Sequence, residues 1–278
     1  MKLHLPSGIA TRVIDRGAGP VVLLLHGNPD NADEWARVID ALAGRFRCIA
    51  PDLPGYGAAG DTTALPAGWR YTIDNQVEFV DQLLAALDIG EVTLAVHDIG
   101  GIMGVPWAAR NTRRLRGVVY TNTVAYPDWE WFPVAKMWGS PRLGDRVRSR
   151  LMMRALGVRR GRLFARRFGA QHPQLDAREL ARFTGDFACN AAAKQTTLAQ
   201  FKYLATPGFF AGYDQMLKAI AAATPTRTVW GTGDPYVPDE RAEQLFATTL
   251  ERLPGIGHWV PIVAADHVAR HVAGCAAG

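Results

Sequence analysis

The chain has 278 residues, of which 48% are apolar and 21% are charged, and its formal net charge is +5. This composition is ordinary for a soluble globular protein, and the length suits one domain with a sizeable insertion. No apolar run reaches the roughly 18 residues that a membrane span needs, so we expect no membrane partner.

Three widely spaced cysteines, Cys48, Cys189 and Cys275, show neither a metal-ligand nor a disulfide pattern. The first residues, Met-Lys-Leu-His-Leu-Pro, lack the apolar stretch of a secretory signal. The sequence therefore predicts a protein of the reducing cytoplasm without a metal site.

Six short apolar runs recur along the chain, and most end in segments rich in glycine, proline or aspartate. Such runs are typical of strands buried in a parallel sheet. Helical spacing lies between them, most clearly over 73–87, and further helices are expected over 239–249 and 262–273. About the first 18 residues predict an antiparallel edge pair, and the whole predicts a mostly parallel α/β sheet. The runs are Val21–Leu25, Phe46–Ala50, Val92–Val96, Gly117–Tyr120, Thr226–Trp230 and Leu250–Leu253.

The alternation stops between residues 126 and 223, where the sequence contains no strand-like run. We interpret residues 126–223 as a helical cap inserted into a core made of residues 1–125 and 224–278. Such a cap would roof the carboxyl ends of the strands, where α/β folds bind their ligands.

Residues 142–182 contain twelve arginines against three acidic residues. A nucleic-acid partner would need such charge, but no aromatic stacking motif accompanies it, so we expect none. We expect solvated arginine faces on amphipathic helices, with Val147, Leu151 and Ala155 as an inner stripe. The arginines would also attract an anionic substrate or speed the escape of an anionic product.

The third run ends in Val-His-Asp-Ile-Gly-Gly, residues 96–101. The two glycines suit a sharp turn from strand to helix that would lift Asp98 out of the sheet edge. A carboxylate there would attack carbon to form an alkyl ester, which water then cleaves. The sequence argues against a serine esterase, because none of the serines, Ser7, Ser140 and Ser149, lies at such a turn.

Asp98, Asp234 and His258 each follow an apolar run. If the runs are parallel strands, these side chains meet at one sheet edge in the order nucleophile, acid, base. His258 would activate water, and Asp234 would orient its imidazole. Each residue alone also fits a turn or capping role, and the three together favour catalysis.

The first run ends in His-Gly-Asn-Pro, residues 26–29. A glycine lets backbone approach a ligand closely. The backbone N–H groups of Asn28 and Ile99 would then form an oxyanion or leaving-group pocket.

These segments, with Asp-Leu-Pro-Gly-Tyr-Gly (52–57), Gly-Thr-Gly-Asp-Pro (231–235) and Gly-His-Trp (257–259), resemble the α/β-hydrolase family. Within it they look like the branch of haloalkane dehalogenases and epoxide hydrolases. The resemblance covers the chain outside the cap. It implies an α/β-hydrolase fold, a small-molecule substrate, an aspartyl-ester intermediate and no cofactor.

Two departures leave the leaving group open. Haloalkane dehalogenases usually carry tryptophan directly after the nucleophile, where this chain has Ile99, but Asn28 matches their second halide donor. Epoxide hydrolases use two cap tyrosines to protonate the epoxide oxygen. We favour a haloalkane, with an epoxide or another strained ring as the alternative and a non-catalytic small-ligand-binding protein as a third possibility. The candidate cap donors are Tyr126, Tyr203 and Tyr213 for an oxygen, and Trp129, Trp131 or Trp138 for a halide.

Overall fold

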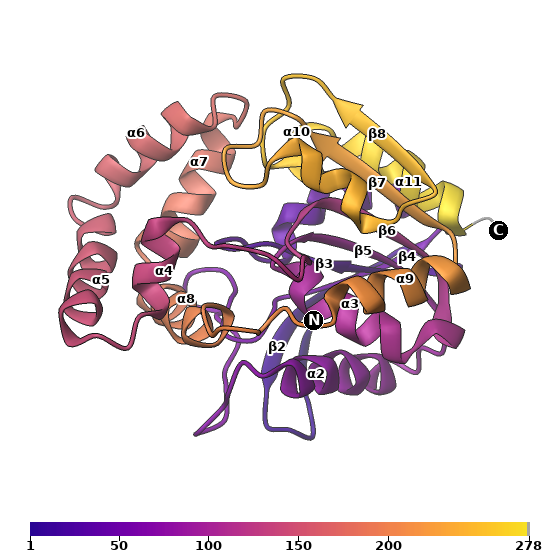
Figure 1. Cartoon of the computed structure of the whole chain (residues 1–278), viewed down its shortest axis with the longest axis horizontal. Coiled ribbons are helices and arrows are strands. Elements are labelled where there is room, and N and C mark those ends of the chain that lie inside the picture. The colour runs from indigo at the N-terminus through magenta and orange to yellow at the C-terminus, as the bar shows by residue number, and fades with distance from the viewer. Residues whose placement is uncertain (277–278) are drawn as a thin grey trace.

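A computed structural model describes residues 1–276 and shows one twisted sheet between two layers of helices (Figure 1). The strands follow one another in the order β1-β2-β4-β3-β5-β6-β7-β8. β2 pairs antiparallel with β1 and β4, and all other neighbours are parallel. This confirms the predicted mostly parallel α/β sheet and its antiparallel edge pair. The strands are β1 (Lys2–His4), β2 (Ala10–Arg16), β3 (Val21–Leu25), β4 (Arg47–Pro51), β5 (Val92–Asp98), β6 (Leu115–Thr123), β7 (Thr226–Gly231) and β8 (Thr249–Leu253).

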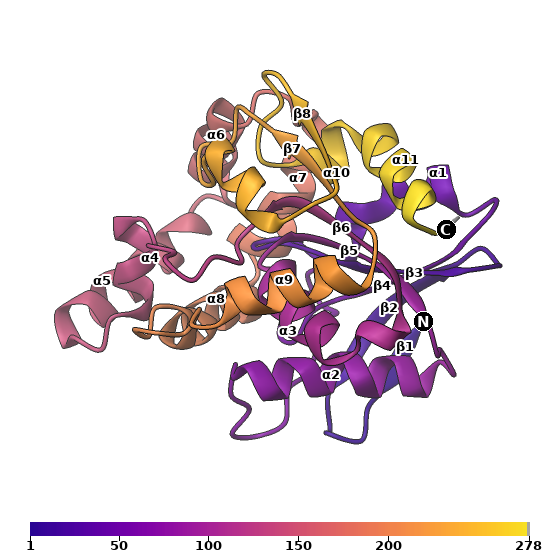
Figure 2. The ribbon, with the colours of Figure 1, turned by 45° about the vertical axis from the view of Figure 1, so that its right-hand side comes forward.

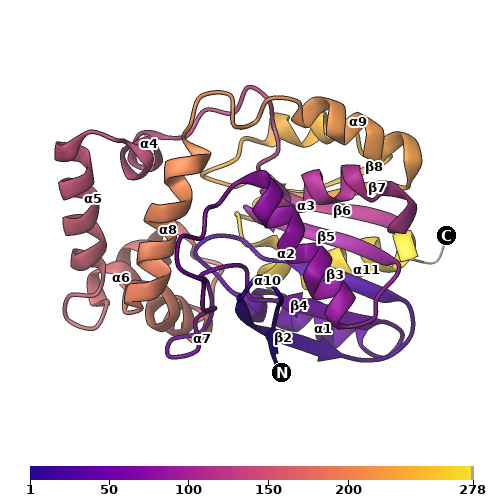
Figure 3. The same cartoon turned by 90° about the horizontal axis from the view of Figure 1, so that it is seen from below.

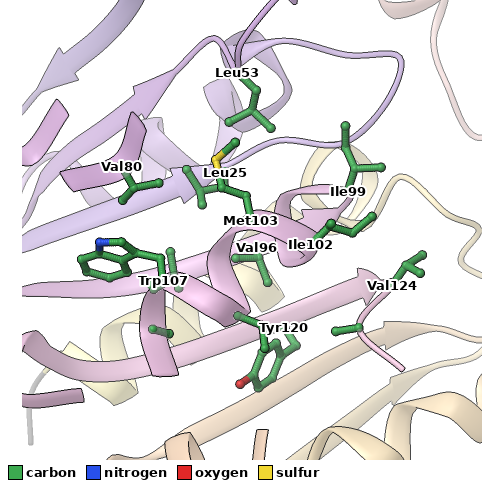
Figure 4. Packing of buried hydrophobic residues seen from close by; sticks show 14 of the residues in the cluster. Leu25, Leu53, Val80, Val96, Ile99, Ile102, Met103, Trp107, Tyr120 and Val124 are labelled. Atoms are coloured by element: carbon green, nitrogen blue, oxygen red, sulfur yellow. The ribbon is translucent and has the colours of Figure 1, made fainter. Parts of the chain in front are cut away.

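Both faces of the sheet are covered, which explains why its strands read as unbroken apolar runs. Leu23 and Leu25 of β3 pack into the cluster that includes α2 (Ile73–Ala86) and α3 (Gly100–Arg110), shown in Figure 4. Val22 and Leu24 pack into the opposite cluster with α1 (Ala36–Leu42) and α11 (Ala265–Ala276). Figure 2 shows the sheet between these two layers.

Each of the six predicted runs falls on one of the strands β3 to β8, with Phe46 alone just outside its strand, and the helix predicted over 73–87 is α2. The helix predicted over 262–273 is α11, preceded by the short α10 (Val260–Val263). The helix predicted over 239–249 is a 3-10 helix that ends at Leu245, because Phe246 takes a left-handed conformation with φ 52° and the chain then enters β8. Among residues 1–276, no helix is both long and apolar enough to cross a bilayer.

Five helices follow β6 and form a lobe at one end of the sheet (Figures 1 and 3). The next helix, α9 (Tyr213–Ala223), instead packs on α3, and the Tyr213 hydroxyl donates to the Ile102 carbonyl at 2.7 Å. We therefore propose that the cap consists of α4 to α8 and that α9 belongs to the core, which shortens the predicted cap. The cap helices are α4 (Pro133–Gly139), α5 (Leu143–Leu156), α6 (Arg162–Gln171), α7 (Ala177–Phe183) and α8 (Ala191–Leu204), with a π-helical turn over Thr184–Ala188.

The inner stripe predicted for α5 is wrong. Val147, Leu151 and Ala155 are exposed, whereas Ser149 and Met153 are buried. The Ser149 hydroxyl donates to the Met137 carbonyl of α4 at 3.2 Å, and Met153 packs in a cluster with residues of the π-helical turn and α8. The neighbours of α5 thus fix its rotation, and the sequence spacing alone cannot reveal them.

Candidate active site

Asp98 ends β5 at the sharp turn that the sequence predicts. Its φ of 44° is left-handed, a conformation that aspartate tolerates better than most residues. Side chains at Gly100 and Gly101 would collide with the Leu25 carbonyl and the Thr123 hydroxyl. The Thr123 hydroxyl also donates to the Asp98 carbonyl at 2.7 Å. The turn is therefore held tightly, and it presents the Asp98 side chain to a cavity beneath the cap.

Backbone donors hold the Asp98 carboxylate. The Asn28 N–H donates to Asp98 Oδ2 at 2.8 Å, as expected for one half of the predicted oxyanion pocket. Burial raises the pKa of Asp98 above its ordinary value. The charges of His258 and His97 and the N–H groups of Asn28 and Ile99 oppose that rise only in part. As the pH falls, this carboxylate is therefore protonated at a higher pH than an exposed aspartate.

Asp234 follows β7 and His258 follows β8, and their side chains meet. Asp234 Oδ2 lies 2.7 Å from His258 Nδ1, which leaves the other ring nitrogen for a substrate or water. The amide of Asn122 donates to the same oxygen at 2.7 Å, and the N–H groups of Tyr236 and Val237 donate to Oδ1 at 2.7 and 3.1 Å. Burial acts to raise the pKa of Asp234, but its partners, His258 above all, hold that pKa below its ordinary value. The structure thus brings the predicted acid, as an ionised carboxylate, and the predicted base together in an oriented pair.

Tyr236 belongs to the site, although the sequence analysis did not select it. Its ring packs edge-on against the His258 imidazole at 5.0 Å, and its hydroxyl lies 2.9 Å from His172 Nε2. Burial lowers the pKa of His172 to about 4, so that imidazole is neutral near pH 7. A signal for Tyr236 was present, because it directly follows the Gly-Thr-Gly-Asp-Pro turn.

A cavity of about 480 Å³ lies between the cap and the carboxyl edge of the sheet. Asn28, Asp98, Ile99 and His258 reach its wall from the core. Most of the remaining wall is apolar, so the cavity suits a small, largely apolar molecule. The cap side of the wall includes Trp129, Trp131, Phe132, Val134, Trp138, Met152, Leu156, Phe164, Phe168, Phe187 and Phe201.

The tryptophans in this wall differ in whether their indole N–H is already used in a hydrogen bond. The Trp131 N–H is used, because it donates to the Leu204 carbonyl at 2.9 Å. The indole nitrogens of Trp129, Trp138 and Trp259 are buried, and none has a hydrogen-bond partner within residues 1–276. Buried donors without partners are uncommon, so these three are candidate donors to a bound anion. Trp129 and Trp138 therefore remain candidates from the sequence, and Trp131 does not.

The three predicted tyrosine donors do not reach this cavity wall, as far as residues 1–276 define it. Tyr126 packs near Trp129 and Arg241, Tyr203 packs near Tyr71, and the hydroxyl of Tyr213 is bonded to α3. Their position along the chain placed them near the cap, but packing turns each one elsewhere. Among the described residues, Tyr236 is the tyrosine that lines the cavity.

The side chain of Asn28 is fixed by hydroxyl groups. Its Oδ1 accepts from Tyr56 at 3.1 Å and from Thr197 of α8 at 3.0 Å. The Tyr56 hydroxyl also lies 2.6 Å from Gln200 Oε1, again on α8. This arrangement leaves the Nδ2 donor of Asn28 for a ligand, and it makes the cap responsible for orienting a donor of the core.

A second carboxylate–imidazole pair lies behind the site. His97 Nδ1 is 2.9 Å from Glu34 Oε1, and both side chains are fully buried. Burial acts to lower the pKa of His97, but the charge and hydrogen bond of Glu34 raise it to about 9. The remaining nitrogen of His97 and the remaining oxygen of Glu34 contact the backbone of the site. His97 Nε2 lies 3.0 Å from the His258 carbonyl, and Glu34 Oε2 accepts a hydrogen bond from the Gly27 N–H at 3.0 Å. The sequence analysis missed Glu34, whose partner is far away in the chain.

No group of three or more His, Cys, Asp or Glu side chains within residues 1–276 is arranged to hold a metal ion.

Comparison with known proteins agrees with this geometry. Residues 20–265 match the family described as alpha/beta hydrolase fold. A cis-3-alkyl-4-alkyloxetan-2-one decarboxylase of Xanthomonas campestris is 39% identical over 132 residues, 45% of this chain and 44% of that protein. Haloalkane dehalogenase 2 of Mycobacterium bovis is 29% identical over 268 residues, 92% of this chain and 87% of that protein. For the first four curated relatives, the matched segment is 37% to 44% of their own length.

The fold also matches solved structures. The crystal structure of wild-type DBJA has a TM-score of 0.79 and 22% sequence identity, and the match covers 100% of this chain and 98% of that one. Likeness at this identity concerns the fold.

Proposed function

The chain belongs to the α/β-hydrolase fold family, and from that premise we propose that it is a hydrolase acting through a covalent ester on Asp98. Its substrate is a small organic molecule with a leaving group on saturated carbon. A haloalkane dehalogenase-like reaction fits best.

One observation carries this proposal: a carboxylate at the strand-to-helix turn faces the same apolar cavity as His258 of the Asp234–His258 pair. A serine at that turn would favour attack on an ester carbonyl, whereas a carboxylate can displace a leaving group from carbon. The resemblance to haloalkane dehalogenases gives independent support.

The proposed reaction has two steps. A carboxylate oxygen of Asp98 attacks the substrate carbon, and the carbon–halogen bond breaks with its electron pair leaving as halide. The other oxygen, Oδ2, stays on the Asn28 N–H. His258 then takes a proton from water, and the hydroxide adds to the ester carbonyl. The acyl C–O bond breaks, the alcohol leaves and the Asp98 carboxylate is restored, so substrate and water give alcohol, halide and a proton.

The Asn28 amide and the indoles of Trp129 and Trp138 are the proposed donors to the departing halide. All three line the cavity, and the two indole N–H groups have no partner within residues 1–276. These donors would replace the one that is missing at Ile99. Oriented donors in a cavity of low polarity stabilise a developing anion strongly.

A strained oxygen ring, such as an epoxide, is the second candidate, and Tyr236 is the observation that favours it. Tyr236 lines the cavity, and neutral His172 lies within hydrogen-bond distance of the Tyr236 hydroxyl. An alkoxide leaving group needs a proton, which Tyr236 would supply and His172 would help to replace. One relative is named for an oxetan-2-one, which is also a strained oxygen ring.

A single turnover in heavy-oxygen water tests the covalent step. The first product should carry ordinary oxygen from Asp98, and mass spectrometry of quenched enzyme should find the alkyl group on that residue. Heavy oxygen in the first-turnover product would contradict the ester mechanism. If folded protein turns over neither haloalkanes nor epoxides but binds them, the non-catalytic ligand-binding alternative replaces this proposal.

A further inference from the structure

The outer face of α5 carries a stripe of apolar side chains that nothing within residues 1–276 covers. Leu143, Val147 and Leu151 stand at i, i+4 and i+8, which places them on one face of the helix. Their exposed fractions are 74%, 45% and 58%. Five of the seven large apolar side chains that are exposed within residues 1–276 lie between residues 143 and 163, the other two in this segment being Val158 and Leu163. We call Leu143, Val147 and Leu151 the cap stripe.

Arginines surround the cap stripe. Ten of them lie between residues 142 and 167, and all are exposed. Asp145 is the one acidic residue in this segment, and it lies 3.7 Å from Arg148. In the part of the chain that the structure describes, none of the other nine has a carboxylate within salt-bridge distance. The same surface therefore offers apolar side chains together with a large positive charge that is almost uncompensated.

The opposite face of α5 belongs to the cavity. Met152 and Leu156 line its wall, and Phe164 and Phe168 of α6 continue that wall. Figures 1 and 3 place α5 at the outer edge of the cap lobe, away from the sheet. One helix thus separates an exposed basic and apolar surface from the cavity.

We propose that the cap stripe and its arginines dock on an anionic lipid bilayer. A helix with arginines around an apolar stripe lies in the interface plane of a membrane, where lipid tails receive the apolar groups and headgroups pair with the cations. A second copy of this chain would bring equal positive charge against positive charge. Nucleic acid would match the arginines but would leave the three apolar side chains without a partner. The proposal replaces the expectation, drawn from the sequence alone, that no membrane takes part.

If the cap stripe docks on the bilayer, helix α5 lies between the bilayer and the cavity. An apolar substrate dissolved in lipid would meet α5 and α6 first, and the inner faces of these helices line the cavity. The inference does not depend on the proposed reaction, because its test measures binding alone.

Co-sedimentation with lipid vesicles tests the proposal on the full chain. Protein is mixed with vesicles of phosphatidylcholine alone or with about 30% phosphatidylglycerol, at low and high salt. We expect binding to the vesicles that contain phosphatidylglycerol at low salt, at least about tenfold weaker binding to phosphatidylcholine, and release at high salt. Failure to bind the anionic vesicles, or equal binding to both kinds, overturns the proposal.

Two sets of variants locate the surface. The triple change L143Q/V147Q/L151Q and the charge reversal R150E/R154E should each weaken vesicle binding at least about tenfold. The matched controls are F246Q, which alters an exposed apolar residue outside the cap, and R70E/R113E, which reverses two exposed arginines of the core. The controls should bind as the wild type does. If the triple variant fails to fold by circular dichroism, the charge reversal decides, and binding that survives it overturns the proposal.

Two further measurements cover the other occupants. Light scattering at rising concentration reports self-association, and a titration with duplex DNA reports nucleic-acid binding. If L143Q/V147Q/L151Q abolishes a dimer but leaves vesicle binding intact, the surface is an interface between copies and the proposal fails. If DNA binds more tightly than anionic vesicles and the triple change does not affect it, the partner is nucleic acid and the proposal fails.

Discussion

Two buried carboxylate–imidazole pairs lie within the same small region, and only one of them reaches the cavity. The nearest nitrogen–oxygen distances are 2.7 Å in Asp234–His258 and 2.9 Å in Glu34–His97. The imidazoles themselves lie side by side, with ring centroids 4.6 Å apart. His258 lines the cavity, whereas His97 is enclosed on every side.

The comparison teaches that a short distance between a carboxylate and an imidazole does not by itself identify a catalytic pair. An imidazole can activate water only where water and substrate reach its free nitrogen. His97 is fully buried, with Nδ1 2.9 Å from Glu34 Oε1 and Nε2 3.0 Å from the His258 carbonyl, so neither nitrogen faces the cavity. We therefore assign the Glu34–His97 pair to positioning: it joins the nucleophile strand, the loop of Gly27 and the backbone of the base.

The largest expected effect comes from the pair that reaches the cavity. His258→Gln should still alkylate Asp98 but should lower turnover by about 10³-fold or more, because the ester loses its general base. Quenched-flow measurement should find a halide burst near one per site, and mass spectrometry should find the ester. A folded variant that does not alkylate would contradict the division between the two steps.

The next largest effect comes from residues that line the cavity, and it distinguishes a halide leaving group from an epoxide oxygen. If a halide leaves, Asn28→Ala should lower haloalkane turnover by about 10²-fold, because one of few donors is lost. Tyr236→Phe should then have little effect on the same substrate, since a halide needs no proton. If an epoxide is the substrate, Tyr236→Phe should lower turnover strongly and Asn28→Ala should have little effect. Both variants are assayed against both substrates, with Tyr203→Phe as the control tyrosine away from the cavity.

The enclosed pair should act on stability more than on turnover. Glu34→Gln should cost about 3–5 kcal/mol in the free energy of unfolding, because it leaves His97 buried without its counter-charge. Turnover of the folded variant should fall by less than about tenfold, in contrast to His258→Gln. Denaturant unfolding and steady-state kinetics on the same preparations measure the two quantities. An unchanged unfolding free energy would show that the pair is not ionised.

The pH dependence of stability sharpens this assignment. The pKa of His97 rises from 6.5 to about 9 on folding, so its contribution is complete below 6.5 and is lost as pH rises through about 9. Burial acts to raise the pKa of Glu34, but His97 holds it below 4.5, so the contribution of Glu34 is complete above 4.5 and is lost in acid. The penalty of Glu34→Gln should therefore be larger at about pH 6 than at about pH 10. A penalty that does not change with pH would indicate lost packing alone.

The smallest effect concerns the cap's hold on Asn28. Thr197→Val removes one of the hydroxyls that orient this amide and should lower turnover about fivefold, with a smaller change in KM. Thr197→Ser keeps the hydroxyl and should restore most of the rate. The neighbouring Thr196→Val serves as the control, because its hydroxyl bonds to the Gly55 carbonyl instead. Equal losses in Thr197→Val and Thr197→Ser would show that packing, not the hydroxyl, matters.

The strands and the core site residues could be predicted from the sequence because their signals are local. Each apolar run ends at or within three residues of the end of a strand, and parallel topology then brings Asp98, Asp234 and His258 to one edge. The cap could not be predicted in the same detail. Tyr203 and Tyr213 turn away from the cavity, and α5 presents Val147 and Leu151 outward, because contacts distant in the chain set these orientations. Glu34 was missed for the same reason: its partner lies more than sixty positions away.

The crowding around the turn at Asp98 has an evolutionary consequence. Side chains are sterically excluded at Gly27, Gly100 and Gly101, so these three positions cannot vary without moving the backbone. Residues 98 and 99 face the cavity, and residue 98 must also tolerate the left-handed backbone conformation of the turn. A lineage with this turn can therefore exchange its nucleophile, or the residue after it, by single substitutions while the scaffold stays unchanged. A change of reaction would then need substitutions only at residues 98 and 99, and the rest of the turn would keep its sequence.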